Sequence, residues 1–204
     1  MYFWTIQSNI VIKSLLDNNI YYPNFNLTSN SCASSNMRPL YPTLLNLYNK
    51  VNHTNYEGLL FGFGNSERLT INSEKDLYDY FVNNPAVSIA FNFWNTDYCI
   101  LKIQVDEDIN VLPIDFNDFI KLVVVKTKNT DFIKMWGITQ REVNNIVYNF
   151  KNGIVDSLFP SFTQIHYSHI DKNNIKGIYP LIDYKTNSLF SLTPEAMELK
   201  NIIE

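Results

Sequence analysis

Hydrophobic and polar residues alternate along several short runs of the chain, with the period of two that is typical of β-strands. The alternation is clearest at residues 98–105, where Leu101, Ile103 and Val105 are separated by polar residues. Similar runs of β-forming residues predict further strands at residues 2–6, 20–22, 57–63, 87–93, 109–112, 161–167, 175–182 and 188–191.

Apolar residues spaced three or four apart predict helices between these strands. The helices are expected to begin at Ser8, near residue 40, and at Ser73, Asp115, Thr139 and Thr193. Thr139 followed by Glu142 is a capping-box pattern, and Gly153 marks the end of that helix. Because hairpins alternate with segregated helices, we expect one α+β domain over residues 1–204, with mixed, mainly antiparallel sheets and peripheral helices.

Residues 24–38 are rich in Asn and Ser and have no periodicity, which predicts a long loop. Loops of this length inside compact domains are often lids or binding loops. The apolar content of 46% is enough for a sizeable core in the rest of the chain.

Charge and hydropathy exclude several classes of protein. The net charge is −4 and no run of Lys or Arg exceeds two residues, so general nucleic-acid binding is not expected. The chain contains no window of about 18 apolar residues, which predicts no membrane partner. Lys13 and Asp17 interrupt the first apolar stretch, so no signal peptide is expected, and Cys32 and Cys99 are isolated. These features predict a cytoplasmic protein with reduced cysteines, and the abundant Asn, Ile, Tyr, Phe and Lys indicate an AT-rich bacterial or phage genome.

Two strands near opposite ends of the chain carry polar residues among β-forming ones. The first is Tyr2-Phe3-Trp4-Thr5-Ile6-Gln7, and the second is Phe162-Thr163-Gln164-Ile165-His166-Tyr167. We expect Thr5, Gln7 and Gln164 to line one cleft, with Tyr167 available to stack on a planar ring.

These segments carry a resemblance to an uncharacterised bacterial and phage family. Its members begin on a Trp-Thr-x-Gln strand, as Trp4 to Gln7 do here, and have a late strand in which an aromatic residue follows a glutamine. Gln164 and Tyr167 lie in the matching late segment. The segments Val105-Asp106-Glu107-Asp108 and Val111 to Phe116 are also similar to this family.

The chain also resembles ADP-ribosyltransferase folds. The likeness covers the first strand and helix, and the closing segment from Gln164 to Ile178. This resemblance implies an NAD-binding transferase that modifies a macromolecular target, as a toxin or anti-defence effector does. It implies catalytic roles for Gln164, Gln7 and Thr5, and contacts to NAD from Trp4, Thr5 and Tyr167.

The chain departs from that family at both ends of the implied site. The family has a catalytic glutamate on the late strand, where this chain has Gln164. An amide can hydrogen-bond a ribose hydroxyl, but it carries no charge to stabilise an oxocarbenium-like state. The first strand offers Thr5 and Gln7 in place of the family's His or Arg, and a shared fold does not by itself confer the activity.

Other groups of residues indicate no chemistry by their spacing. His166 and His169 are three residues apart and point to opposite faces of a strand, so no metal site is expected. Residues 106–108 are acidic and are interpreted as a solvated turn. The segment 62–65 lacks the spacing of a phosphate-binding loop.

The alternative is a non-enzymatic phage-type inhibitor or interaction protein that binds a host macromolecule, most simply a protein. Aromatic residues are favoured at such interfaces. The candidate anchors are the exposed members of a set that flanks the 24–38 loop: Tyr21, Tyr22, Phe25 and Tyr41.

Overall fold

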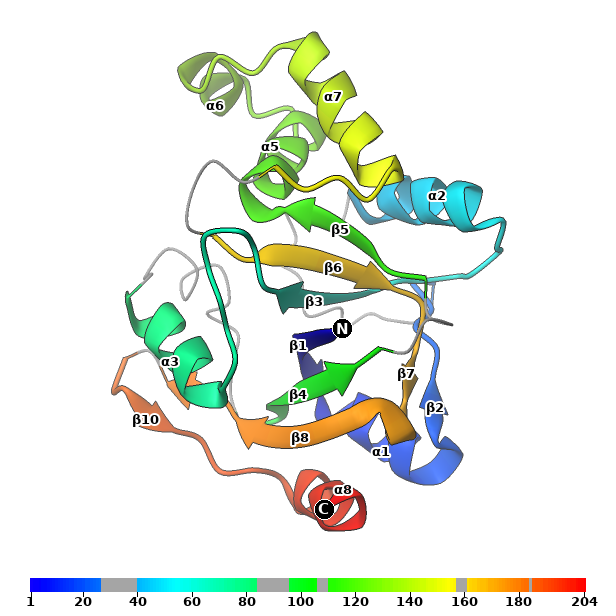
Figure 1. The fold of residues 1–204 in the computed structure, drawn as a ribbon, viewed down its shortest axis with the longest axis vertical. Coiled ribbons are helices and arrows are strands. Elements are labelled where there is room, and N and C mark those ends of the chain that lie inside the picture. The colour runs from blue at the N-terminus through cyan, green and yellow to red at the C-terminus, as the bar shows by residue number, and fades with distance from the viewer. Residues whose placement is uncertain (27–39, 84–95, 106–109, 157–160, 184) are drawn as a thin grey trace. The chain divides into compact units, whose positions relative to one another are not determined.

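The computed structural model describes residues 1–204 except for 27–39, 84–95, 106–109, 157–160 and 184. In the described part the chain has antiparallel sheets with peripheral helices, which confirms the α+β prediction (Figure 1). The chain forms two compact units that alternate along the sequence: unit 1 is Met1–Tyr22, Thr70–Ile109 and His169–Glu204, and unit 2 is Pro23–Leu69 and Asn110–Ser168. The single domain expected over residues 1–204 stays a prediction.

Unit 1 is built on three antiparallel strands. β4 (Tyr98–Gln104) pairs with β1 (Tyr2–Ser8) on one side and with β8 (Ile175–Pro180) on the other (Figure 1). This confirms the strands predicted at 2–6 and 98–105. The predicted strand 175–182 is interrupted at Leu181, and its end becomes β9 (Ile182–Asp183), which pairs with β10 (Ser188–Leu189).

Three helices belong to unit 1 in the described part of the chain: α1 (Asn9–Asn18), α3 (Glu74–Asn83) and α8 (Pro194–Ile203). α1 follows Ser8 as predicted and ends at Asn19, whose φ of 64° is in the left-handed region that suits a helix C-terminus. α1 and α8 are joined through Asn9, whose amide group bonds both Glu195 and the Thr193 hydroxyl. The short strands β2 (Ile20–Tyr21) and β7 (Ile170–Asp171) form a separate pair, and a 3₁₀ turn at Lys172–Asn174 follows.

Unit 2 has its own three antiparallel strands, with β6 (Thr163–Tyr167) at the centre. β6 pairs with β3 (Leu60–Gly64) and with β5 (Leu112–Asp115), so that Gln164 lies opposite Phe63 on one side and Ile114 on the other. The prediction of a strand at 109–112 is wrong by three residues. The correct strand is the one whose alternate residues, Leu112 and Ile114, are buried.

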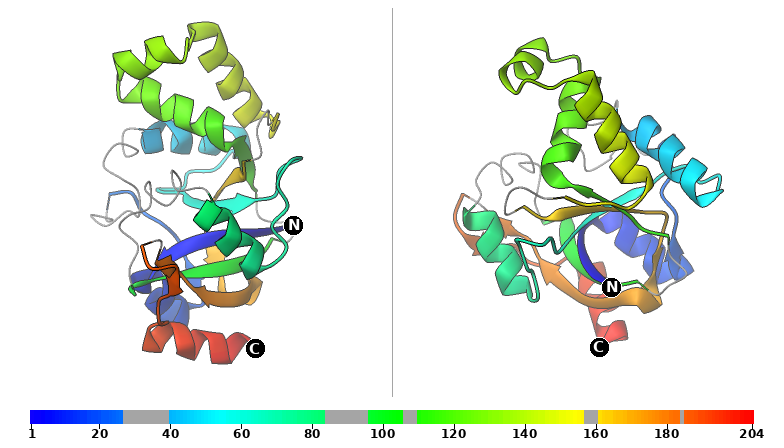
Figure 2. Two further views of the ribbon diagram at one scale, coloured as in Figure 1. Left: turned by 90° about the vertical axis from the view of Figure 1, so that its left-hand side faces the viewer. Right: turned by 45° about the horizontal axis from the view of Figure 1, so that its top comes forward.

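Four helices accompany this sheet in the described residues: α2 (Tyr41–Asn52), α5 (Phe116–Lys126), α6 (Thr130–Met135) and α7 (Gln140–Lys151). The core between them and the sheet contains Leu44, Tyr48, Phe119, Ile146 and Phe150, each at most 3% exposed. α5 and α7 lie side by side, and α6 lies at the end of this pair that is farthest from β5 (Figures 1 and 2).

Some predicted elements differ in position from those in the structure, some elements were not predicted, and some predictions concern residues that the structure does not describe. The strand expected at 57–63 begins at Leu60, and the sequence pattern did not predict α6 or β7. The strand expected at 87–93, the acidic residues 106–108 and most of the loop at 24–38 lie outside the described residues.

Candidate functional site

Thr5 and Gln7, two of the predicted site residues, share a face of β1 and contact each other. The Gln7 amide Nε2 donates a hydrogen bond of 2.7 Å to Thr5 Oγ1. Thr5 is fully buried and Gln7 is 5% exposed. The structure therefore brings these two residues together, as a polar pair in the interior.

Trp4 lies between them in sequence and points to the opposite face of the strand, because side chains alternate along β1. Its ring centroid is 5.6 Å from that of Tyr179, and Lys102 Nζ lies 5.0 Å from the Trp4 ring. A cation at this distance over an indole ring is attracted to it. Trp4 thus does not share the face of Thr5, with which it was expected to bind NAD.

Gln164 and Tyr167, the predicted residues of β6, are three positions apart and point to opposite faces of that strand. Gln164 is 6% exposed and Tyr167 is fully buried. Tyr167 therefore does not lie on the Gln164 face, where it was expected to stack on a bound ring. The placement of Gln164 beside Gln7 in one cleft stays a prediction.

His166 lies on the same face of β6 as Gln164 and is fully buried. The ring nitrogen Nδ1 lies 3.2 Å from the carbonyl oxygen of Leu112 and donates to it, because a carbonyl only accepts. The rings of Phe61 and Phe150 meet the imidazole edge-to-face at 5.1 Å each. Burial lowers the pKa of His166 to about 3, although the bond to Leu112 opposes the shift, so the ring is neutral.

The neutral imidazole leaves Nε2 without a hydrogen-bond partner among the described residues. Its surroundings are aromatic, and no carboxylate or hydroxyl in the described part is bonded to it. No three His, Cys, Asp or Glu side chains gather into a metal-binding group within the described residues. His166 therefore acts as a core residue that joins β6 to β5.

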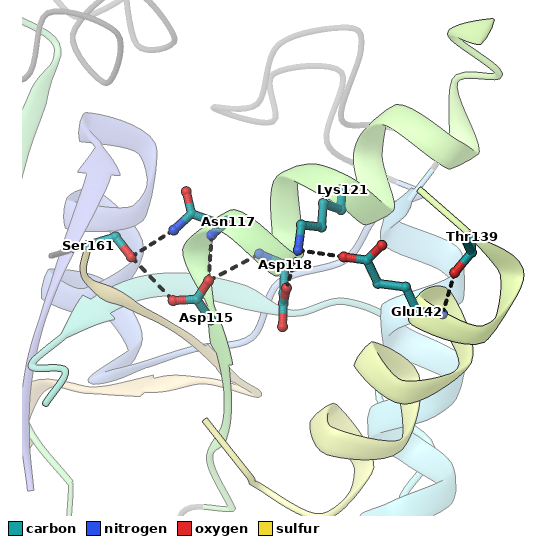
Figure 3. Close-up of polar contacts among 7 residues, drawn as sticks. All are labelled: Asp115, Asn117, Asp118, Lys121, Thr139, Glu142 and Ser161. Carbon is teal, nitrogen blue, oxygen red and sulfur yellow. Dashed lines mark hydrogen bonds and ion pairs between the residues drawn. The ribbon is translucent and has the colours of Figure 1, made fainter. Parts of the chain in front are cut away.

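A polar network in unit 2, which the sequence did not predict as a site, begins at Asp115 (Figure 3). Asp115 caps α5: its Oδ1 accepts hydrogen bonds from the backbone N–H groups of Asn117 and Asp118. Its Oδ2 accepts a bond of 3.2 Å from the hydroxyl of Ser161. Asp115 is 5% exposed, so this carboxylate is a buried connection between the start of α5 and Ser161, two residues before β6.

Lys121 continues the network from α5 to α7. Its ammonium Nζ lies 3.2 Å from Asp118 Oδ1 and 2.7 Å from Glu142 Oε1 (Figure 3). Burial raises the pKa of Asp118 and the Lys121 charge only partly offsets this, whereas the two carboxylates raise the pKa of Lys121 against the effect of its own burial. The Glu142 backbone N–H is in turn bonded to Thr139 Oγ1, which confirms the first half of the predicted capping box.

This arrangement is suited to holding helices together more than to acid–base chemistry. Each carboxylate already shares the one ammonium, and Asp118, Lys121 and Glu142 expose between 22% and 35% of their side chains. The consequence is a fixed geometry for α5 and α7, the two helices between which α6 is connected.

α6 differs from the other helices of the described chain because none of its residues is buried. Three large apolar side chains at α6 and directly after it are exposed: Phe132 by 42%, Met135 by 67% and Trp136 by 45%. The rings of Phe132 and Trp136 pack on each other, with centroids 5.3 Å apart. We call these three residues the α6 surface.

Local hydrogen bonds and turns order the α6 segment, although the side chains of the α6 surface are exposed. Asn129 caps α6 by accepting a bond from the Phe132 N–H, and the connection reverses through Lys128 and Gly137, both with positive φ. The turns on both sides are therefore specified by their residues. The sequence signal for this element was Asn129 followed by a Phe-x-x-Met-Trp run, which is too short for periodicity to reveal.

The aromatic anchors predicted near the 24–38 loop are only partly surface residues. Tyr22 is 56% exposed, whereas Tyr41 is 7% exposed and stacks between Phe25 and Phe61. Tyr41 belongs to the core of unit 2, so it is not one of the exposed members of that set.

Comparison of the chain with protein-family models, with curated proteins and with solved structures finds no match. The resemblances to the bacterial and phage family and to ADP-ribosyltransferase folds stay predictions. Within the residues that the structure describes, no helix is long and apolar enough to cross a bilayer.

Proposed function

We propose that this protein acts by binding a partner through the α6 surface, without catalysis and without a small-molecule cofactor. The observation that supports the proposal is the exposure of Phe132, Met135 and Trp136 on a helix that buries none of its own residues. Clustered exposed apolar side chains on a folded protein mark interaction sites, and Trp, Phe and Met are enriched in such sites.

α6, which lies in the connection between α5 and α7, contributes no buried residue to the core. The connection is nevertheless capped and closed by specific residues. Asn129 and Thr139 provide two N-caps, and Lys121 bonds α7 to α5. A surface that is ordered before binding loses less conformational entropy when the partner docks. This preorganisation favours a recognition role for α6 over a role as a simple linker.

The test is affinity capture from the native host with the whole chain as bait. The variant Phe132→Ser/Met135→Ser/Trp136→Ser should lose the partner and keep its thermal stability. The matched control is Tyr148→Ser, which removes a 62% exposed aromatic from the neighbouring helix α7 and should retain the partner. Capture of the same protein in equal amount by wild type and the triple variant would refute the proposal.

The second candidate is the ADP-ribosyltransferase-like, NAD-dependent activity that the resemblance implies. It is favoured by the order of β1 and α1, and by the contact between Thr5 and Gln7 on the first strand. Calorimetry with NAD, together with mass spectrometry of a candidate target, distinguishes the two. Heat of binding, or a target mass raised by one ADP-ribose, would favour the transferase. The absence of both signals would favour a protein that only binds a partner.

A further inference from the structure

We propose that the partner of the α6 surface is an anionic lipid surface, on which the protein docks peripherally. This inference rests on the proposed binding function and names the partner by its chemistry. It departs from the expectation of a protein partner without membrane contact, because the charges around α6 were not evident as a patch from the sequence alone.

The charge around the α6 surface is opposite in sign to that of the whole chain. Residues 126–141 carry a net charge of +3, whereas the whole chain carries −4. The cations are Lys126, Lys128, Lys134 and Arg141, against the single carboxylate of Asp131. All four cations are exposed, and none takes part in an ion pair with a described residue.

These cations lie on the elements that carry, precede or follow the three apolar side chains along the chain. Lys126 ends α5, Lys134 belongs to α6 itself, and Arg141 lies in the first turn of α7. Lys128 precedes the cap residue Asn129 at the start of α6. Exposed apolar groups flanked along the chain by exposed cations match a bilayer surface, where acyl chains lie beneath anionic headgroups.

The composition of this set of four cations favours lipid over protein as the partner. Three of its four cations are lysines, and Lys is depleted at protein–protein interfaces, whereas polybasic Lys clusters are used at anionic membrane surfaces. A stable protein interface also needs about 20 residues on each side. A bilayer imposes no such requirement, because a few aromatic side chains can insert shallowly beneath the headgroups.

The exposed aromatic residues support the same partner. Within unit 2, α6 lies at the end of the α5–α7 pair that is farthest from β5 (Figures 1 and 2). Trp and Phe are residues that settle at the boundary between headgroups and acyl chains. Trp136 is then a direct reporter, since it is 45% exposed whereas Trp4 is 2% exposed.

The experiment uses the full chain and extruded vesicles of phosphatidylglycerol mixed with phosphatidylcholine, compared with vesicles of phosphatidylcholine alone. We expect co-sedimentation with the anionic vesicles only, weakened by added salt. Trp emission should shift to shorter wavelength on binding, and the shift should be smaller in Trp136→Phe, which keeps Trp4 and Trp94.

Two variants separate the local patch from net charge. Lys128→Glu/Lys134→Glu should weaken vesicle binding roughly thirtyfold or more, as expected for losing two lysine contacts with anionic lipid. Lys50→Glu/Lys75→Glu changes the net charge equally at exposed sites outside the patch, and should bind nearly as wild type. Phe132→Ser/Met135→Ser/Trp136→Ser should also lose binding.

Absence of vesicle binding, or binding that the two charge variants weaken equally, would overturn the lipid assignment. If wild type ignores vesicles but captures a protein in an α6-dependent way, the lipid inference fails and the proposed binding function stands. If capture is also independent of α6, both fail.

Discussion

Lys121 Nζ on α5 lies 2.7 Å from Glu142 Oε1 on α7, so one ion pair links the two helices between which α6 is connected. Lys121 and Glu142 expose 30% and 35% of their side chains, and pairs this exposed contribute little to global stability. The pair therefore adds to a contact between α5 and α7 that depends mainly on buried residues such as Phe119 and Phe150.

The first prediction is that Lys121→Met lowers the free energy of unfolding by no more than about 1 kcal/mol, because the lost pair is partly solvated. Urea titration measures this change. A double-mutant cycle with Glu142→Gln isolates the pair, and a coupling energy of zero would contradict its role.

The second prediction concerns the buried cap of α5. Asp115→Ala removes the acceptor for the N–H groups of Asn117 and Asp118 and for the Ser161 hydroxyl, and we expect a loss of about 2 kcal/mol. Asp115→Asn keeps one acceptor oxygen and should lose less. Urea unfolding of the two variants gives the comparison, and equal losses would mean that the charge, not the cap, is what matters.

The third prediction is an acid destabilisation that depends on His166. The folded-state pKa is lowered to about 3 from the ordinary 6.5, so the unfolded chain binds the extra proton between these values. Stability from the neutral ring is complete above pH 6.5 and falls toward pH 3, at about 1.4 kcal/mol per pH unit. Denaturant unfolding from pH 7 to pH 4 measures this slope.

The control compares His166→Gln with His53→Gln, at an exposed histidine. The first variant should be less stable at pH 7 and should show a flatter pH dependence. The second should follow wild type. His169 adds to the slope in the same direction, because burial lowers its pKa as well. A pH dependence identical in wild type and His166→Gln would contradict the assignment.

The elements with strong local signals were predictable from the sequence. The alternation of β4 and the cap at Thr139 each depend on neighbouring residues, and both are found as expected. α6 was missed because six residues give less than two turns of periodicity. The basic segment 126–141 was missed because its cations are separated by uncharged residues and form no Lys or Arg run, and their exposure is known only from the structure. The burial of Gln164 depends on long-range pairing with Phe63 and Ile114, which no local pattern specifies.

The fourth prediction separates surface from core among the aromatic residues. Phe132→Ser/Met135→Ser/Trp136→Ser should change the free energy of unfolding by less than about 1 kcal/mol, because α6 buries none of its residues. Phe150→Ala, at a fully buried position, should cost about 3–5 kcal/mol by leaving a cavity. Thermal and urea unfolding of both variants provide the comparison. A triple variant that unfolds like Phe150→Ala would show that the α6 surface is structural.

The last prediction tests the role of Gln164 by introducing a charge at its position. In the transferase interpretation, Gln164→Glu supplies the carboxylate that the family uses, and NAD binding or turnover should rise. In the binding interpretation, the new carboxylate is placed at a 6% exposed position between Phe63 and Ile114, where its ionised form is poorly solvated. We expect the second result: Gln164→Glu should be markedly less stable than wild type at pH 7, with no heat of binding to millimolar NAD.

The pH dependence of the stability distinguishes an effect of the new charge at position 164 from an effect of side-chain shape. A buried carboxyl has a raised pKa in the folded state, so its penalty is greatest when the unfolded chain is ionised, and it fades as the pH falls toward about 4.3. Gln164→Glu should therefore recover part of its lost stability between pH 7 and pH 5, relative to the uncharged, similarly sized Gln164→Met. Unfolding of both variants at the two pH values measures the difference. A Gln164→Glu protein as stable as Gln164→Met at pH 7, and able to bind NAD, would instead support the transferase.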